Sequence, residues 1–243
     1  MPSRLTEIWV YLAASPLFGL TLTLLAYQGA FWLYRRTGSH PLANPVMLAV
    51  AMLVSILWIT GTPYRSYFDG AQFVHFLLGP ATVALAIPLH AQFRRLRAMA
   101  LPLLVALVAG SLTAALSAVA VGYWLGASKA VLLSLAPKSV TTPIAMGIAE
   151  RIGGLPSLTA VLVIITGILG AVGARYVYQA LRIEDQATRG FALGIASHGI
   201  GTARAFQESE QAGAFAALAM GLNGLVTAAL LPLVMAWLGR WLY

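Results

Sequence analysis

The stretch Pro137-Lys138-Ser139-Val140-Thr141-Thr142-Pro143 lies inside a long apolar run and decides how the rest of the chain is interpreted. Proline has no backbone N–H and cannot continue a helix undisturbed. It also pushes the preceding residue out of the helical region, so we expect the backbone to unwind between Pro137 and Pro143. Broken backbone and charge are tolerated in lipid only where they face protein or a water-filled cavity. This stretch is therefore the first candidate for a binding site.

The composition predicts that the chain is an integral membrane protein. Of its 243 residues, 60% are hydrophobic and 9% are charged, whereas a soluble domain carries about 25% charged residues. We therefore expect an all-α polytopic membrane protein with the lipid bilayer as its surroundings. The net charge of +8 comes from basic residues clustered at segment ends, as in cytoplasmic loops, so nucleic acid is not expected as a partner.

The chain divides into apolar segments joined by short connections. We expect about seven of them to span the membrane as helices. The segments are Ile8–Tyr34, Pro45–Thr60, Ala71–Phe93, Met99–Leu125, Ala127–Ile152, Ser157–Leu181, Gly190–Phe206 and Ala212–Leu238.

The charges indicate the path of the chain. The basic clusters are Arg35-Arg36, Arg94 to Arg97, Arg182 with Arg189, and Arg240. All of them lie inside, as basic loops prefer, only if Ala127–Ile152 enters and leaves on the same side. We therefore predict that this segment is a re-entrant broken hairpin. Glu150, Glu208 and Glu210 then lie outside.

The resulting orientations predict an inverted repeat. Residues 44–125 and 157–240 would run in opposite directions, and each has a middle segment interrupted by glycine or proline. We expect a single transmembrane domain over 1–243. Its parts are an N-terminal helix at 1–40, a first repeat at 44–125, the broken hairpin at 127–152 and a second repeat at 157–240.

The first break has the chemistry of a carboxylate site. Lys138 supplies a positive charge, and Ser139, Thr141 and Thr142 supply hydroxyl donors. The N–H groups that start the second half-helix point into the break, with the positive end of the helix dipole behind them. The alternative is a kinked helix in which Lys138 has a structural role.

A second break lies at Ser197-His198-Gly199-Ile200-Gly201-Thr202-Ala203-Arg204. Gly199 and Gly201 permit unusual backbone geometry, and His198 can donate to substrate or carry a proton. Thr202 can contact substrate, and Arg204 can clamp a carboxylate. The alternative for Arg204 is a position at the outer rim beside acidic residues.

Two further features lie on neighbouring helices. Asn223 and Thr227 share a face of the last helix, where they line the cavity or make an inter-helix hydrogen bond. Gly167, Gly170 and Gly173 recur every third residue, which is typical of close helix packing.

Enzyme signatures are missing from the sequence. His, Asp and Glu residues do not occur at metal-ligand spacing, and no nucleotide-binding loop or nucleophile elbow is present. We therefore expect neither an enzyme, nor a metal, nor a cofactor. Every acidic residue falls at a segment end, so a coupling proton would need His198 or the substrate itself.

Several motifs resemble the LrgB/CidB family of bacterial membrane proteins, from about Asn44 to the C-terminus. The matching pieces are Leu77 to Leu89, Ala136 to Ala145, Ile152 to Ala160, His198 to Arg204, and Leu218 to Gly224. The chain also resembles the C-terminal half of the plastidal glycolate/glycerate translocator.

The resemblance implies two competing functions in the bacterial inner membrane. One is transport of small monocarboxylates such as pyruvate, glycolate or glycerate. The other is an antiholin-like role that tempers murein hydrolase activity with a small LrgA/CidA-type partner. A lysine within the apolar span, hydroxyl groups and two helix breaks favour the transporter, and a channel is a third alternative. Assembly as a homo-oligomer stays open.

Overall fold

The computed structural model describes residues 16–38, 43–77, 80 and 83–242, and all of its regular elements in those ranges are helices. The chain forms two compact units, residues 1–84 and 85–243. The boundary falls inside the predicted first repeat at 44–125. The grouping of the four predicted parts into one transmembrane domain stays a prediction.

Among the described residues, four helices are long and apolar enough to cross a membrane: α2, α8, α11 and α13. These helices indicate a multi-pass membrane protein. Seven spans and the inverted repeat are not confirmed. The predicted segment Ala71–Phe93 is divided among α4, α6 and the start of α7, with residues 78–79 and 81–82 of its Gly/Pro interruption outside the described ranges.

In the described part of the first unit, α2 contacts both α3 and α4. The helices are α2 (Pro16–Arg36), α3 (Pro45–Thr60) and α4 (Tyr64–Phe76). Asn44 caps α3 because its side chain accepts hydrogen bonds from the N–H groups of Val46 and Met47, at 2.9 and 3.2 Å. Gly19 lets α2 approach α4 closely, since a Cβ there would lie 2.2 Å from the Tyr67 carbonyl oxygen. Residues 8–15 of the predicted N-terminal helix lie outside the described ranges.

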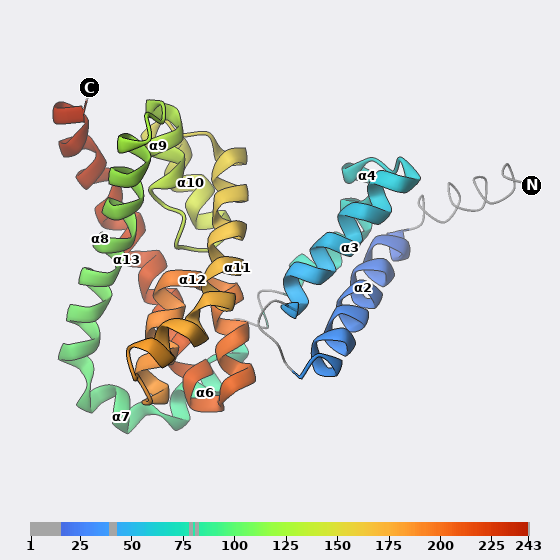
Figure 1. Ribbon diagram of the computed structural model, residues 1–243, viewed down its shortest axis with the longest axis horizontal. Coiled ribbons are helices and arrows are strands. Elements are labelled where there is room, and N and C mark those ends of the chain that lie inside the picture. Colours follow the sequence, from blue (N-terminus) through green and yellow to red (C-terminus); the bar gives the residue numbers. More distant parts are fainter. Residues whose placement is uncertain (1–15, 39–42, 78–79, 81–82, 243) are drawn as a thin grey trace, which may run out of the picture. The chain divides into compact units, whose positions relative to one another are not determined.

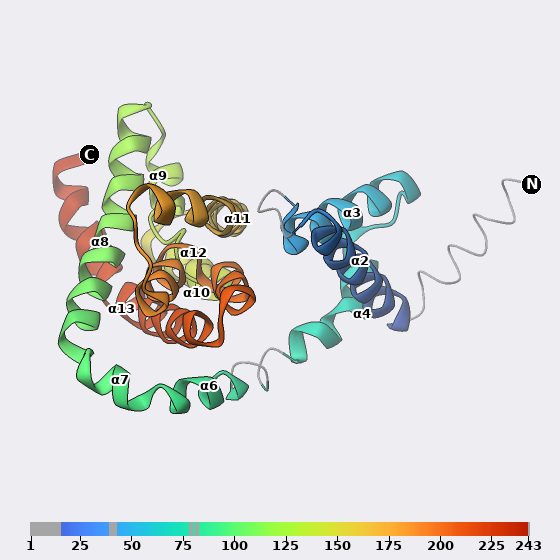
Figure 2. The same ribbon diagram turned by 60° about the horizontal axis from the view of Figure 1, so that its bottom comes forward.

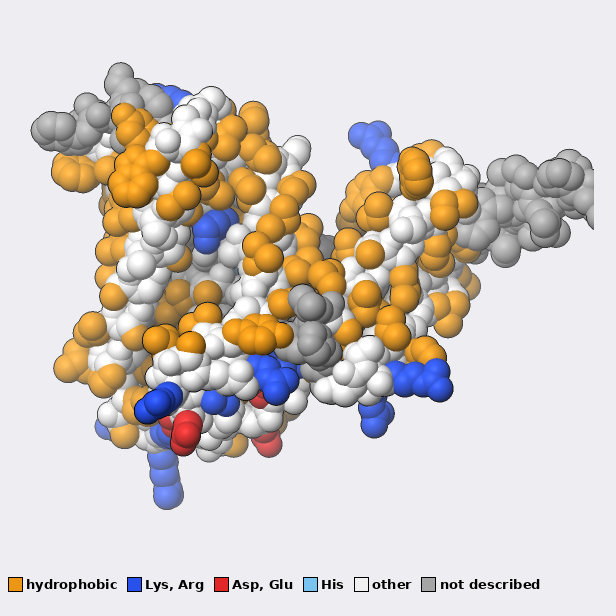
Figure 3. Space-filling model, viewed as in Figure 1, with side chains coloured by type: hydrophobic (Ala, Val, Ile, Leu, Met, Phe, Trp, Pro, Cys, Tyr) orange, Lys and Arg blue, Asp and Glu red, His pale blue; other side chains and the backbone are white. Residues whose placement is uncertain are grey.

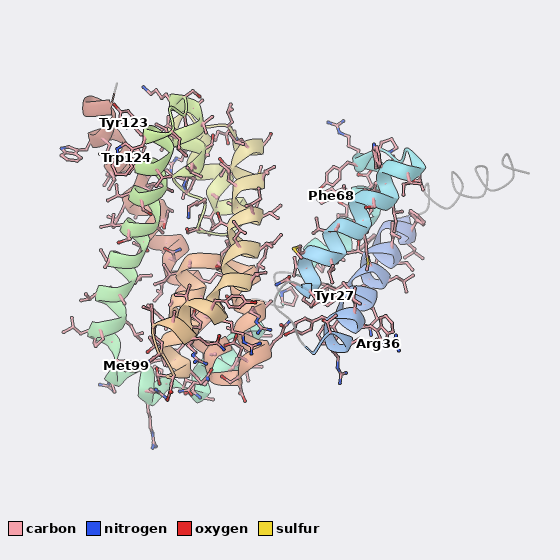
Figure 4. The ribbon with its side chains drawn as sticks, viewed as in Figure 1. Tyr27, Arg36, Phe68, Met99, Tyr123 and Trp124 are labelled. Carbon is pink, nitrogen blue, oxygen red and sulfur yellow. The ribbon has the colours of Figure 1, made fainter. Side chains whose placement is uncertain are left out.

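The second unit contains the remaining helices, and its long helices run between two ends (Figure 1). They are α6 (Ala86–Ala91), α7 (Phe93–Ala98), α8 (Ala100–Trp124), α9 (Lys129–Leu135), α10 (Thr142–Ile152), α11 (Pro156–Ala180), α12 (Gln186–Glu208) and α13 (Glu210–Leu242). Figure 4 marks the ends of α8 by Met99 and by Tyr123 and Trp124. We call them the Met99 end and the Trp124 end.

The region between α8 and α11 is a hairpin that starts and finishes at the Trp124 end (Figure 1). We call it hairpin 1; its arms are α9 and α10. Its first arm meets the start of α11, because the Leu155 N–H donates to Ser134 Oγ at 2.7 Å and the Thr159 hydroxyl to the Ser134 carbonyl at 3.0 Å. The chain thus enters and leaves this region at one end of the unit, the course expected from the charges.

Helix α12 is also a hairpin, which overturns the expectation that Gly190–Phe206 spans the membrane. The backbone leaves the helical region at Ser197 and His198, so α12 has two arms. A Cβ on Gly201 would lie 2.7 Å from the Leu193 carbonyl oxygen, a proximity that eight residues of straight helix, roughly 12 Å of rise, would forbid. Both feet of this hairpin 2 lie together, since Ser209 Oγ donates to Gln186 Oε1 at 3.3 Å.

Hairpin 2 has its feet at the Met99 end. Arg95, just before α8, pairs with Asp185 at the start of α12 at 2.5 Å. Two expectations are therefore wrong: Glu208 and Glu210 share an end with Arg182, and Arg240, near the far end of α13, does not. These sides were predicted wrongly because α12 was counted as a membrane-spanning helix.

The long helices enclose the two hairpins. Figure 2 shows α10 and α12 between α8, α11 and α13, and each hairpin contacts both α11 and α13. The described residues form three core clusters: one with Val119, Leu133 and Leu231, one with Leu107 and Phe215, and one with Tyr178 and Leu193. The first also contains Val140 of hairpin 1 and the second Ile195 of hairpin 2, so the apolar packing extends to both hairpins.

Candidate functional site

The tip of hairpin 1 is the break predicted from its prolines. Helix α9 ends at Leu135, α10 starts at Thr142, and Pro143 occupies the first turn of α10. Thr141 precedes that turn with an extended backbone and makes no side-chain hydrogen bond to it. The first N–H groups of a helix have no partner within the helix, so those of α10 face the tip with the positive dipole end behind them.

Lys138 lies at this tip and is half-buried, whereas Ser139 is buried beside it. The Lys138 ammonium donates to Ser139 Oγ at 3.3 Å. Thr141 and Thr142 are half-buried at the start of α10. The four residues predicted for this break therefore lie together, and they offer one positive charge and three hydroxyls.

The tip of hairpin 2 is a sharp reversal at two residues. His198 has φ 42° and ψ −132°, a backbone conformation that residues with a Cβ rarely adopt. Its Nε2 lies 3.0 Å from the Val163 carbonyl oxygen, and because a carbonyl only accepts, Nε2 carries the hydrogen. The Thr202 hydroxyl donates to the His198 carbonyl at 2.9 Å. The reversal is thus held by α11 on one side and by its own second arm on the other.

Glycines on α11 make room for this tip. A Cβ on Gly170 would lie 1.7 Å from Ser197 Oγ, and one on Gly167 would lie 2.8 Å from the His198 ring. The expectation of close packing is confirmed for these two glycines, although their neighbour is a hairpin tip. Gly173 has open space where a Cβ would be. Ser197 Oγ is fully buried and has no hydrogen-bond partner among the described atoms.

Asn223 on α13 joins the two tips. Its Nδ2 donates to the Ser139 carbonyl of hairpin 1 at 3.2 Å and to the Ile195 carbonyl of hairpin 2 at 3.0 Å. Its Oδ1 accepts from Ser111 Oγ on α8 at 2.5 Å and from Thr227 Oγ1 at 3.2 Å. A side-chain amide has two donors and room for two acceptor bonds, so Asn223 is fully satisfied by protein. Asn223 therefore makes the inter-helix hydrogen bonds that were its alternative role. Its amide has no hydrogen-bonding group left for the substrate contact that we predicted.

The structure brings some predicted residues together and separates one. Asn223 links the carbonyl of Ser139, the neighbour of Lys138, to that of Ile195, three residues before His198. Gly201 serves the close approach of the two arms of hairpin 2, and Gly199 lies 3.8 Å from the Met220 sulfur, measured from the Cβ position it lacks. Arg204 lies near the feet of hairpin 2, where it pairs with Glu208 at 3.4 Å. This is the rim position considered as its alternative.

Sequence reasoning missed three contributors. Ser111 is one of two serines in the apolar helix α8, and the sequence carries no signal of its contact with Asn223. Ser197 precedes His198 in the second break, and its place beside the glycines was the available clue. Arg175 lies within α11 and, with Arg189 and Arg204, lines a polar pocket at the Met99 end; no pattern in the sequence groups them.

The Met99 end is the charged end of this unit. Figure 3 shows acidic and basic side chains gathered there, with apolar side chains along the flanks. Asp185 caps α12, and the Thr188 backbone N–H, the Thr188 hydroxyl and Arg95 together hold the pKa of its carboxyl below the ordinary value. Within the described part of the chain, no group of three or more His, Cys, Asp or Glu residues is placed to hold a metal ion.

Comparison with known proteins places these features in a family. A family described as LrgB-like matches residues 23–237. An uncharacterized protein of Bacillus subtilis (strain 168), YwbG, is 37% identical over 90% of this chain and 97% of its own length. A protein of Bacillus cereus (strain B4264) named antiholin-like protein LrgB is 31% identical over 93% of this chain and 98% of its own length. No solved structure matches the chain.

Proposed function

The chain belongs to the LrgB-like family, and we propose that it is a secondary transporter of small monocarboxylates of the pyruvate, glycolate or glycerate type. One observation carries the proposal: two broken hairpins enter from opposite ends, and Asn223 joins their tips near Lys138. A discontinuous segment whose half-helix N-terminus faces the interior is a recurrent design for holding an anionic substrate in a transporter.

The proposed substrate site is the tip of hairpin 1. The Lys138 ammonium would neutralise the carboxylate, and the first N–H groups of α10 would donate to its oxygens. The hydroxyls of Thr141 and Thr142 would donate to the 2-oxo or 2-hydroxy group of such acids. Among the described residues, Lys138 makes one long hydrogen bond, of 3.3 Å to Ser139 Oγ, so its remaining N–H groups suit an anion.

Each hairpin would close this site from one end. Hairpin 1 lies between the tips and the Trp124 end, and hairpin 2 lies between the tips and the Met99 end. Movement of one hairpin against α11 and α13 would expose the tips to one end at a time, which is the requirement of alternating access.

The proposed orientation places the Met99 end in the cytoplasm of a bacterium and the protein in its inner membrane. In membrane proteins, lysine and arginine residues near the ends of spanning helices are enriched on the cytoplasmic side. The basic residues near the Met99 end are Arg94, Arg95, Arg97, Arg182, Arg189 and Arg204. Those near the Trp124 end are Lys129, Arg151 and Arg240.

The alternative function is an antiholin-like regulator of murein hydrolase activity, acting with an LrgA/CidA-type partner. The name of the Bacillus cereus relative favours it. A regulator that moves no solute has no evident need for a lysine at a broken tip in the middle of an apolar bundle, because such a charge is costly there. In a transporter, the same lysine would bind the anionic substrate, which accounts for a charge at this position.

Uptake by the purified chain alone tests the proposal. The chain is reconstituted into liposomes, and uptake of labelled pyruvate and glycolate is compared with that of empty liposomes. We expect saturable uptake and counterflow against unlabelled substrate. Uptake without saturation would indicate a channel, and its absence both alone and with an LrgA/CidA-type partner would favour the regulator.

A further inference from the structure

A polar pocket of about 320 Å³ lies at the Met99 end, away from the hairpin tips. Its walls come from the last turns of α11, which supply Arg175, and from both feet of hairpin 2, which supply Arg189 and Arg204. Arg204 follows His198 by six residues, roughly 9 Å of helical rise. The pocket is therefore separate from the proposed substrate site, and a ligand can bind there whether or not the chain transports carboxylates.

The charge of the pocket is strongly positive. Three guanidinium groups line it, against a single carboxylate, that of Glu208. Glu208 is engaged with Arg204 at 3.4 Å. The described residues that line the pocket include no second acidic group to balance Arg175 and Arg189, which leaves two positive charges unmatched.

Arg189 is held in place and keeps hydrogen-bond donors available. Arg189 donates from Nε to the Ile183 carbonyl at 2.6 Å, and its guanidinium lies over the Tyr178 ring at 5.6 Å from the centroid. The described residues make no hydrogen bond to the terminal nitrogens of Arg189, which can therefore bind a ligand. Arg175 is exposed on α11, five residues before that helix ends at Ala180. Fixed guanidinium groups lose little freedom when they bind an oxyanion.

We propose that this pocket binds a phosphate group, carried by an anionic phospholipid headgroup or by a soluble phosphate. Guanidinium forks match phosphate oxygens two at a time, and the two unmatched positive charges favour an anion, whether a soluble phosphate or the singly charged phosphodiester of a lipid headgroup. The end of a spanning helix is also where lipid phosphates lie. A bound phosphate would bridge α11 to both feet of hairpin 2 and so hold that hairpin closed at its base.

The test measures the melting temperature of the purified full chain in a neutral detergent. Inorganic phosphate is titrated against sodium chloride of equal ionic strength, and in a second arm the chain is placed in phosphatidylcholine vesicles with or without phosphatidylglycerol. We expect a saturable rise with at least one probe. A rise with phosphate assigns a soluble ligand, and a rise with phosphatidylglycerol only assigns a lipid headgroup. No rise with either overturns the proposal.

Three variants locate the effect. Arg175→Gln with Arg189→Gln should raise the half-saturating concentration by about tenfold or more, because charge-assisted contacts are lost. Arg97→Gln, an exposed arginine at the same end but outside the pocket, should leave it unchanged. Glu208→Gln removes the opposing charge and should tighten binding. Unaltered binding in the double variant, or weaker binding in Glu208→Gln, would exclude this pocket.

Discussion

The two hairpins reach the same place by different means. Hairpin 1 turns over the six residues from Ala136 to Thr141, between prolines, and carries Lys138 at its tip. Hairpin 2 contains no proline and reverses at Ser197 and His198, with one residue at positive φ. The first break is caused locally by its prolines, whereas the second is caused by packing against other helices.

The packing that folds hairpin 2 comes from glycines on two helices. A Cβ on Gly190 would lie 2.0 Å from the Ala212 carbonyl oxygen, and one on Gly194 would lie 2.3 Å from that of Ala216. Backbone contact with α13 at these positions fixes the first arm. Gly167 and Gly170 on α11 then receive the tip. A break of this kind depends on residues far apart in the sequence.

The largest expected effect concerns the ends from which the hairpins enter. The chain has no cysteine, so single cysteines can be placed at Ser128 and Arg151 for hairpin 1 and at Glu184 and Glu210 for hairpin 2. A membrane-impermeant maleimide should label the first two from one side and the last two from the other. Labelling of positions 184 and 210 from opposite sides would restore α12 as a crossing and remove the comparison.

The next effect tests whether packing builds hairpin 2 but not hairpin 1. Gly190→Ala should lower the free energy of unfolding by about 1–3 kcal/mol, because the new methyl group overlaps the α13 backbone. The matched control is Gly147→Ala on α10, where a Cβ meets nothing within 4 Å. It should be neutral or stabilising, since alanine is the better helix former. Equal unfolding midpoints for the two variants would contradict this account.

The difference between the two hairpins explains which parts of the structure the sequence predicts. The apolar segments predict helices well, and Pro45–Thr60 is α3 to the residue. Hairpin 1 could be predicted because proline and lysine act locally. For hairpin 2 the sequence predicts the break at Ser197 to Arg204 but not the reversal, because the reversal depends on the contact of Gly190 with the backbone of α13, which no local pattern indicates. The role of Asn223 was hidden for the same reason: its partners lie on α8 and on both hairpins.

A smaller effect separates the chemistry of the two tips. Lys138→Ala should weaken binding of labelled pyruvate to the purified chain by roughly one to two decades, the loss of a charge-assisted contact. Lys129→Ala is the control, since Lys129 is exposed on the first arm of the same hairpin. Unchanged affinity in a monodisperse Lys138→Ala protein would make this lysine structural.

The smallest expected effect lies at the tip of hairpin 2. His198 is buried within the break, and no acidic residue is available in the apolar segments to carry a proton. Its Nε2–H donates to the Val163 carbonyl, so Nδ1 is the nitrogen left to take up a proton. If uptake is coupled to protons, His198 is therefore the protein group best placed to change charge beside Lys138.

His198→Gln separates hydrogen bonding from protonation. A glutamine amide can still donate toward the Val163 carbonyl but cannot take up a proton, so substrate binding and counterflow should stay near the wild-type values. Acceleration of uptake by an imposed pH gradient should be lost. His90→Gln, at an exposed histidine of α6, should keep that acceleration. If the pH gradient still accelerates uptake in His198→Gln, His198 does not carry the coupled proton. Hairpin 2 would then act only by its movement, and the proton would travel with the substrate.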